Sequence, residues 1–210
     1  MVGNEVLNEC LASEEIDKVT ILTRKEAKVT HAKLQEVLIK DFLDLSSYQV
    51  HFENIDIAFF CIGVYTGQVP DDLFRSITID YPVAFANALK QHSPQASLCF
   101  LSGAGADRTE KSNMAFAKYK GIAENKLSEI GLGSFHSFRP GYIFPVEKRK
   151  EPNLFYAAAR FMYPIISLFG SNSSIKSSTL AQAMVKVGLT GQGPEALENK
   201  DIVAVVETGT

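Results

Sequence analysis

Two near-continuous apolar runs most strongly constrain how this chain can fold. They are "IDIAFFCIGVY", residues 55–65, and "ASLCFLSGAGA", residues 96–106, and each ends near small residues. Runs of this kind are typical of strands buried on both faces, as in a parallel sheet with helices on either side. Between them lies a segment with helical spacing, residues 70–91, in which Pro82 predicts a kink or a late helix start.

The rest of the chain continues this alternation of strands and helices. The other predicted strands are "DKVTILTRK", "LQEVLIKDFLDL" and "SFHSFRPGYIFP", and the other predicted helices are "NEVLNECLAS", "KSNMAFAKYKGIAENKL" and "SSTLAQAMVKVGL". The late apolar segment "KDIVAVV" predicts a final short strand or an extended tail. This order predicts an α/β fold with a doubly wound parallel sheet, which binds ligands beyond the carboxyl ends of its strands.

The helix ends are predicted from capping residues. Ser112 or Asn113 is expected to cap the helix after residue 111, and Gly131 is expected to end it. Ser177 or Ser178 is expected to cap the last predicted helix.

Composition and charge argue against several classes of protein. The 210 residues are 46% hydrophobic and 21% charged, as in an ordinary globular domain. A formal net charge of -3 and a pI near 5.8 argue against a nucleic-acid-binding surface, which needs clustered positive charge. Cys10, Cys61 and Cys99 lie far apart in apolar runs and predict buried thiols rather than disulfides or metal ligands.

No targeting or membrane segment is predicted. The N-terminal residues lack the basic and apolar pattern of a signal peptide. The apolar segment 154–170 is too short to span a membrane and is interrupted by Arg160 and Pro164. A cytoplasmic location is therefore expected.

The ends of the five predicted strands carry a family resemblance. They read, in order, "LTRK", "IKDFLD", "CIGVY", "LSGAGAD" and "FRPGY". Together they resemble the atypical short-chain dehydrogenase/reductase family, and within it the NAD(P)-binding oxidoreductases of the Tat-interacting-protein type. The resemblance runs from "VGNEVL" to "EALENK". It implies one Rossmann-like NAD(P)-binding domain over residues 1–210, with residues 146–178 as a small lid on the substrate side.

The sequence departs from this family at its start. The family begins with a strand, central in the sheet, and a glycine-rich turn of the form GATGxVG, whose last glycine Gly3 matches. The first strand and the first two glycines are therefore missing. One hypothesis is a start codon assigned too late, with Met1 inside the turn. The other is a real truncation, which should leave an unprotected sheet edge and weak cofactor binding.

The resemblance also implies which nucleotide is bound. At the end of the family's second strand an acidic residue suits NAD, whereas an arginine suits the 2′-phosphate of NADP. Thr23, Arg24 and Lys25 stand there, so NADP(H) is the predicted cofactor. The alternative is a solvated basic turn. Asp41 matches the residue that contacts adenine, although an aspartate there can equally begin a turn.

Further cofactor contacts are implied at the next strand ends. Gly63, with Cys61 two residues before it, matches the glycine that lets the cofactor pass close to the backbone. A simple strand end is the alternative for Gly63. Pro140 and Gly141, after the strand "SFHSFR", complete the predicted cofactor-binding set.

The catalytic pair of the family is only half preserved. In the family a tyrosine donates the proton during hydride transfer, and a lysine four residues later holds the nicotinamide ribose. Lys120 matches the lysine, but Phe116 stands at the tyrosine position and has no proton to give. Tyr142 could replace it. Ser102 matches the region of the serine that binds the substrate carbonyl, or it simply ends a strand.

Two functions follow from these residues. One is an NADP-dependent oxidoreductase acting on a small carbonyl or alcohol, with water, Ser102 or Tyr142 as proton donor. The other is a non-catalytic NADPH-binding sensor or regulatory protein, which Phe116 favours. The apolar residues of the predicted lid could line a substrate pocket, form a contact with a second copy or a protein partner, or belong to the core.

Overall fold

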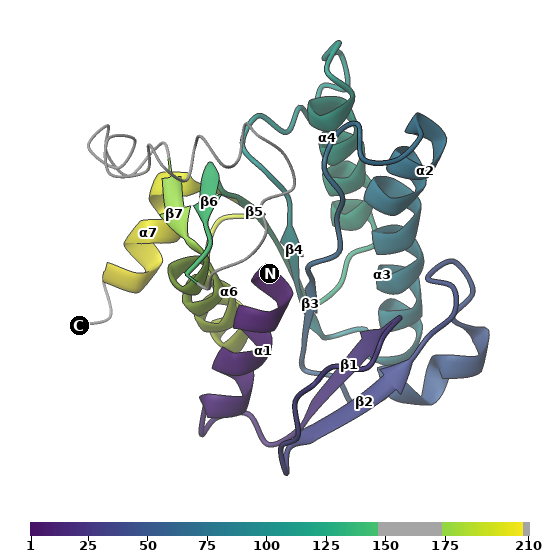
Figure 1. Cartoon of the computed structure of the whole chain (residues 1–210), viewed down its shortest axis with the longest axis vertical. Helices are drawn as coiled ribbons and strands as arrows, with labels where there is room; N and C mark the ends of the chain where they lie inside the picture. The colour runs from purple at the N-terminus through teal and green to yellow at the C-terminus, as the bar shows by residue number, and fades with distance from the viewer. Residues whose placement is uncertain (147–173, 208–210) are drawn as a thin grey trace.

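The computed structural model describes residues 1–146 and 174–207 (Figure 1). The strands are β1 (Val19–Thr23), β2 (Leu34–Leu38), β3 (Ile57–Phe60), β4 (Ser97–Leu101), β5 (Ser134–Arg139), β6 (Tyr142–Phe144), β7 (Ser174–Lys176) and β8 (Ala196–Glu198). The α-helices are α1 (Val2–Ala12), α2 (Asp71–Arg75), α3 (Tyr81–His92), α4 (Ala115–Glu129), α6 (Ser177–Thr190) and α7 (Asn199–Glu207). A 3-10 helix covers Ser46–Phe52.

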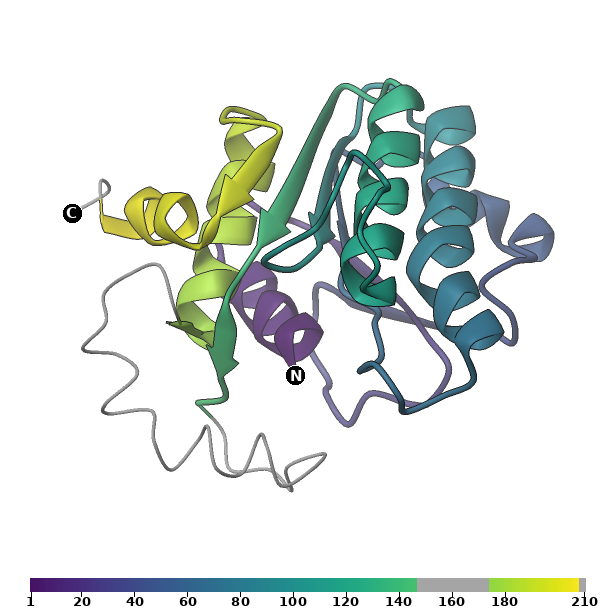
Figure 2. The same cartoon turned by 90° about the horizontal axis from the view of Figure 1, so that it is seen from above.

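The strands form parallel pairs with helices on both faces. The order β3-β4-β5-β8 makes one sheet, while β1-β2 and β6-β7 form separate pairs. Helices α1, α6 and α7 lie on one side of the strands, and α3 and α4 lie on the other (Figure 2). The predicted doubly wound α/β fold is confirmed.

Strands β3 and β4 each contribute to two hydrophobic clusters, and this explains their continuous apolar runs. Leu98 and Phe100 of β4 belong to the cluster under α3 and α4, whereas Cys99 between them belongs to the cluster under α1 and α6. Alternate residues of a strand point to opposite faces, so a strand covered on both faces must be apolar at every position. Cys10 and Cys99 are buried in the second cluster, as predicted, whereas Cys61 is only half-buried beside it.

The sheet is interrupted between β1 and β3. Within the described residues β1 pairs with β2, β3 pairs with β4, and no ladder connects the two sheets. This interruption lies at the central position at which the sequence predicted a missing strand.

A change of helix type stands where Pro82 predicted a kink or a late helix start. A π-helical stretch, Ser76–Asp80, separates α2 from α3, and Pro82 lies in the first turn of α3. Proline has no N–H to donate and so cannot continue the hydrogen-bond pattern of the preceding helical turn, in keeping with the change of helix type just before it. The wider π turn joins the two segments without a break in the chain.

The predicted serine caps were wrong. Met114 precedes α4 and Lys176 precedes α6, and neither makes a side-chain capping bond. The Ser112 hydroxyl accepts the N–H of Met114 two residues later (3.2 Å), while Ser177 is the first residue of α6 and donates to Glu5 Oε1 (3.2 Å). The predicted end of α4 is confirmed, because Gly131 follows its last turn with φ +66°.

The segment "KDIVAVV" was wrongly predicted as a strand, since it lies in α7. The strand β8 ends just before it. Ile202 of α7 is fully buried against residues of α6, and the amide of Asn199 at its start donates to Ser174 O (3.1 Å). The preference of β-branched residues for strands is weak, and packing against α6 outweighs it.

Most of the predicted lid, residues 146–178, lies outside the described residues. Val146 is exposed, and the description resumes at β7. In the described ranges, 1–146 and 174–207, none of the helices combines the length and the apolarity needed to cross a membrane.

Candidate functional site

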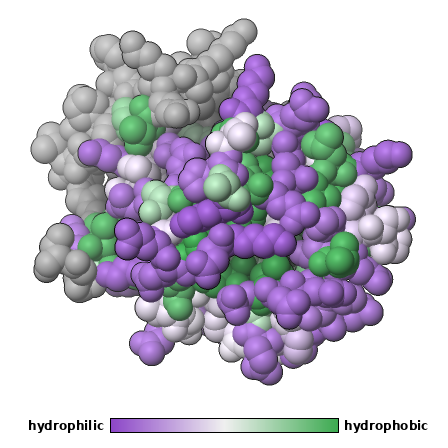
Figure 3. Space-filling view, turned by 90° about the horizontal axis from the view of Figure 1, so that it is seen from below, coloured by the Kyte–Doolittle hydropathy of each residue, from purple (hydrophilic) through white to green (hydrophobic). Residues whose placement is uncertain are grey.

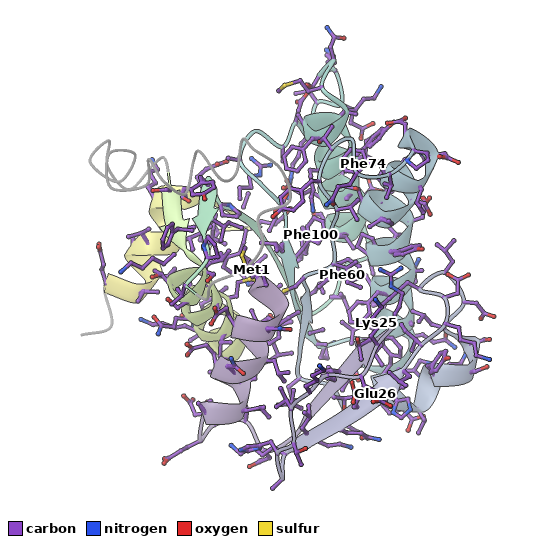
Figure 4. All side chains as sticks on the ribbon, viewed as in Figure 1. Met1, Lys25, Glu26, Phe60, Phe74 and Phe100 are labelled. Atoms are coloured by element: carbon purple, nitrogen blue, oxygen red, sulfur yellow. The ribbon has the colours of Figure 1, made fainter. Side chains whose placement is uncertain are left out.

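The strand ends that carry the family resemblance meet at one edge of the fold. Because β1 runs parallel to β2, and β3 to β4 and β5, their carboxyl ends lead into loops on the same side. Lys25 and Glu26 lie beyond the end of β1, and Met1 lies on the other side of β3 (Figure 4). The candidate site is therefore this carboxyl edge, between α1 and α4.

Lys120 of α4 is the buried cation of the site. Its exposed fraction is 7%, and its Nζ donates to the carbonyl oxygen of Leu101 at the end of β4 (2.7 Å). The same Nζ lies 4.5 Å from the centre of the Phe100 ring, at a distance typical of a cation–π contact. Burial lowers the pKa of Lys120 to about 8, against a smaller opposing effect of Glu124.

Phe116, one helical turn before Lys120, packs against the backbone that follows β4. A Cβ built on Gly103 would lie 2.5 Å from Cζ of Phe116, so glycine at this position makes room for the ring. The ring thus occupies the position expected of the family tyrosine and supplies no hydroxyl. Tyr119 does not replace it, because its hydroxyl donates to Asp71 Oδ2 (2.7 Å) and its ring packs on Phe74 of α2.

A buried carboxylate, Glu124, is the residue of this site that was missed in the sequence. It lies one turn after Lys120 and is completely buried. Its carboxylate accepts the hydroxyls of Ser102 and Ser137 (both 2.6 Å), Nε of Arg108 (2.8 Å), and both Nε and Nη2 of Arg139. Burial alone would raise the pKa of Glu124, but these hydrogen bonds, led by those of Arg139, lower it to about 2.

The two arginines extend this cluster toward β8. Arg108 Nη1 binds Glu195 Oε1 (2.6 Å), and Arg139 Nη1 binds Glu198 Oε1 (2.9 Å). Burial would lower the pKa of Arg108, but its bonds to Glu124 and Glu195 raise it. The cluster joins α4 to the ends of β4, β5 and β8, so it fixes the loops that form the candidate site.

The spacing of residues in the sequence could have identified Glu124 as a residue of this site. Phe116, Lys120 and Glu124 are spaced four residues apart and therefore share one face of α4. That face packs on the sheet, and a carboxylate there must be paired because an isolated buried charge is costly. Its partners, Arg108 and Arg139, come from a loop and a strand that only the tertiary structure brings together.

Ser102 is buried and is committed to this cluster. Its hydroxyl donates to Glu124, and its backbone N–H donates to Phe138 O of β5 (2.8 Å). Its predicted contact with a substrate carbonyl would require the hydroxyl to leave Glu124. That role remains a prediction.

The basic turn after β1 is exposed. The Thr23 hydroxyl donates to Lys25 O (2.8 Å) and so closes the turn, and the side chains of Arg24 and Lys25 lie in solvent. Asp41 Oδ1 accepts the N–H of Leu43 (2.9 Å), which is the turn-forming role that the sequence left open for it. The two cations remain available to an anionic ligand.

The turn between β3 and α2 is open at Gly63. No atom lies within 4 Å of a Cβ built there, so a ligand can approach this backbone closely. Gly3 lies at the start of α1, where a Cβ would be 3.4 Å from Cβ of Cys61. The N-terminus of an 11-residue helix is thus placed beside the end of β3, and such a terminus favours anionic groups.

The last predicted cofactor residues contact neighbouring parts of the protein. Pro140 O accepts the N–H of Ala104 (2.9 Å), and the N–H of Gly141 donates to Asn199 Oδ1 (2.8 Å). Tyr142 is the first residue of β6 and is half-buried. These bonds hold the loop after β5 next to the loop after β4.

Taken together, the residues fit an NAD(P)-sized ligand. The open backbone at Gly63, the start of α1 and the exposed Arg24 and Lys25 suit a phosphate-bearing nucleotide, and Lys120 is buried at the far side of the same edge. Within the described residues, no three or more His, Cys, Asp and Glu side chains are grouped so that they could hold a metal ion.

The fold and the position of this site define a class of protein, the α/β proteins with a Rossmann-like fold. No family model matches the sequence. The chain is 28% identical over 207 residues, which are 96% of it and 83% of the relative, to Protein HTATIP2 of Rattus norvegicus. The predicted resemblance is therefore confirmed, since the chain is similar to HTATIP2 over almost its whole length.

Solved structures share the fold at low sequence identity. One is the enzyme WbmH of Bordetella bronchiseptica in complex with NAD+, with a TM-score of 0.69 and 16% identity over 99% of this chain and 77% of that one. Another is UDP-N-acetylglucosamine 4-epimerase of Bacillus cereus, with a TM-score of 0.66 and 12% identity over 99% of this chain and 81% of that one. At these identities the likeness concerns the fold.

Proposed function

We propose that this chain binds NADP(H) at the carboxyl edge of its strands and acts as a non-catalytic sensor or regulatory protein. The observation that carries the proposal is the face of α4 that meets this edge. There Lys120 keeps the buried position of a cofactor-holding lysine, while Phe116 fills the proton donor's position with a hydrocarbon ring. This arrangement would keep a residue that holds the nucleotide and lacks the hydroxyl that usually donates the proton.

Each predicted contact has a physical basis at this edge. Arg24 and Lys25 would bind the 2′-phosphate of the adenosine ribose, because a guanidinium and an ammonium bind phosphate through charge-assisted hydrogen bonds. The backbone at Gly63 and the start of α1 would bind the pyrophosphate. Lys120 would donate to the hydroxyls of the nicotinamide ribose. The bound nucleotide would supply or accept a hydride.

An oxidoreductase of a small carbonyl or alcohol is the second candidate, and one observation favours it. The lowered pKa of Lys120, about 8, means that this ammonium can release a proton near neutral pH. The oxidoreductase would act on a small carbonyl or alcohol, and the regulatory protein would bind a protein partner. We propose a cytoplasmic location for either function. NADPH oxidation measured against a panel of carbonyl compounds separates the two candidates.

Replacing Arg24 with alanine should reduce selectivity for NADPH. We expect NADPH affinity to fall roughly ten- to a hundredfold with little change for NADH, because one charge-assisted contact with the 2′-phosphate contributes about 1.5–3 kcal/mol. Calorimetric titration with both nucleotides measures this. Lys18→Ala, which removes an exposed cation from the opposite end of β1, is the matched control. Equal losses for both nucleotides would contradict the assignment of Arg24.

Replacing Lys120 with methionine should separate binding from stability. We expect NADPH affinity to fall at least tenfold, because a buried donor to the ribose is removed. Stability should stay equal or rise, since an apolar chain of similar length replaces a buried charge. Lys118→Met, at an exposed position of the same helix, serves as the control. Unchanged NADPH binding by a folded Lys120→Met protein would overturn the role of Lys120.

A further inference from the structure

Lys120 and Glu124 of α4 hold the same peptide group at the end of β4. The Nζ of Lys120 donates to the carbonyl oxygen of Leu101 (2.7 Å), and the hydroxyl of Ser102 donates to Oε1 of Glu124 (2.6 Å). The peptide group between Leu101 and Ser102 is planar and rigid, so a bond that fixes Ser102 also restrains the carbonyl of Leu101. Glu124 therefore helps to place the backbone acceptor of Lys120.

The opposite side of this peptide group is held by β5. The N–H of Ser102 donates to Phe138 O (2.8 Å). In a trans peptide the C=O and the N–H point in opposite directions, so the carbonyl of Leu101 bonds to α4 while the N–H of Ser102 bonds to the neighbouring strand. A shift of Ser102 would weaken both bonds, and the bond from its hydroxyl to Glu124 opposes such a shift.

The carboxylate of Glu124 is itself held in one orientation. It is completely buried and also accepts the hydroxyl of Ser137 (2.6 Å), Nε of Arg108 (2.8 Å) and Nε of Arg139 (3.0 Å). These donors come from β5 and from the loop after β4, so they approach the carboxylate from different elements. A side chain fixed in this way can hold a neighbouring functional group within a narrow range of positions.

Lys120 also needs a nearby negative charge. Hydrophilic residues cover much of the face shown in Figure 3, where water solvates them, whereas Lys120 is buried. Its direct contacts, the carbonyl of Leu101 and the ring of Phe100, carry no net charge. Burying an ammonium is costly, and a carboxylate close to it offsets that cost. Glu124, one turn further along the same face of α4, is such a carboxylate.

Two titratable groups act on the ammonium of Lys120 from α4 and from the end of β3. Burial lowers the pKa of Lys120 to about 8, whereas Glu124 and, more weakly, Cys61 raise it. Burial raises the pKa of the Cys61 thiol to about 12, so this thiol is neutral near pH 7. Burial would raise the pKa of Glu124, but its hydrogen bonds lower it to about 2, so it is ionised. Arg108 and Arg139 bind Glu124 as well and offset part of its charge.

We propose that Glu124 is a positioning residue of the nucleotide site, which orients Lys120 and supplies the negative charge that balances its ammonium. The inference rests on the proposed function, in which this ammonium donates to hydroxyls of the nicotinamide ribose. Glu124 is completely buried and does not touch the nucleotide. It acts through the hydroxyl of Ser102, which restrains the acceptor of Lys120, and through its charge, which keeps Lys120 protonated.

The charge of Lys120 can be measured without any nucleotide, by an NMR titration of labelled lysine side chains in the 210-residue chain. We expect a midpoint near pH 8 for Lys120 in the unmodified chain. In Glu124→Gln the midpoint should be lower by roughly one pH unit, because the charge that favours the ammonium is removed. Glu124→Asp keeps the charge and should stay closer to the unmodified chain, and Lys120→Met identifies the signal. An unchanged midpoint in folded Glu124→Gln would overturn the proposal.

Calorimetric titration with NADPH at pH 6 and at pH 8 tests the consequence for binding. Affinity should fall as the pH rises through the pKa of Lys120, because the protonated side chain offers more donors to the ribose. We expect Glu124→Gln to bind NADPH roughly fivefold more weakly than the unmodified chain at pH 8, where fewer of its Lys120 side chains are protonated. The difference should shrink at pH 6, where Lys120 is protonated in both. An equal loss at both pH values would show a merely structural role.

A matched pair of serine variants tests the orientation of Lys120 and does not depend on the folding of Glu124→Gln. Ser102→Ala removes the hydroxyl next to the carbonyl that Lys120 binds, whereas Ser137→Ala removes a hydroxyl of β5 from the same carboxylate oxygen. We expect Ser102→Ala to reduce NADPH affinity roughly threefold at both pH values, and Ser137→Ala to reduce it less. Equal losses in the two variants, or no loss in Ser102→Ala, would contradict the positioning role.

The two experiments also separate this inference from the proposed function. If the unmodified chain binds no NADPH, the proposed function is wrong, and the titration of Lys120 still decides whether Glu124 controls its charge. If the chain binds NADPH but neither Glu124→Gln nor Ser102→Ala has the expected effect, the proposed function stands and the role of Glu124 is wrong.

Discussion

Replacing Glu124 with glutamine is expected to lower the free energy of unfolding by roughly 3–5 kcal/mol, the cost of removing one partner from a buried ion pair. Glutamine keeps the shape of the side chain but loses the charge that holds Arg108 and Arg139. The Arg139 side chain is only 14% exposed, so its guanidinium has little access to water as compensation. Urea denaturation, followed by circular dichroism, measures the loss.

The control for this experiment lies on the same helix. Glu129→Gln removes an exposed carboxylate near the end of α4 and should change stability by less than about 0.5 kcal/mol. A loss below about 1 kcal/mol for Glu124→Gln would mean that both arginines find other partners. In that case the cluster would not be what fixes the loops after β4 and β5.

The same carboxylate should make stability depend on pH in acid. The pKa of Glu124 is lowered to about 2 in the folded chain, below its ordinary value of 4.5. The stabilisation of the fold by ionised Glu124 is therefore fully present above about pH 4.5 and is lost as the pH falls toward 2. The free energy of unfolding should fall by on the order of 3 kcal/mol over this range. Stability curves between pH 6 and pH 2 should show this loss, and Glu124→Gln should lack that part of it.

Replacing Phe116 with tyrosine is expected to raise NADPH-dependent carbonyl reduction by roughly 10²- to 10⁴-fold over the unmodified chain, the usual effect of a positioned general acid. Phe116 lies one turn before Lys120 on the same face of α4, so a hydroxyl there would be next to the buried ammonium. Because Cζ of Phe116 packs against Gly103, the tyrosine ring must shift slightly to admit its hydroxyl. Steady-state NADPH oxidation with several carbonyl compounds measures the gain.

Two further variants make the result specific to that hydroxyl. Phe116→Leu should leave the low activity unchanged, since neither side chain has a proton to donate. Tyr119→Phe removes the neighbouring hydroxyl, which bonds to Asp71 on the other side of α4, and should also have no effect on reduction. If the unmodified chain turns over substrate rapidly and Tyr142→Phe abolishes this activity, the proton donor is Tyr142 and the non-catalytic proposal is wrong.

The sequence predicted the elements wherever one physical signal was dominant. The apolar runs at residues 55–65 and 96–106 became β3 and β4, because a strand with helices on both faces needs apolar residues at every position. Predictions from local residue preferences were wrong where tertiary packing favoured a different structure. The run "KDIVAVV" forms α7 against α6, and the serines expected to cap α4 and α6 make other bonds.

The sequence by itself also determined the alternating fold, the cation at position 120 and the absence of a hydroxyl at position 116, since these depend on spacing and residue type alone. Only the tertiary structure decided what those residues contact. Arg108, Glu124 and Arg139 are 15 to 31 positions apart in the chain, and the parallel sheet brings their side chains to one edge.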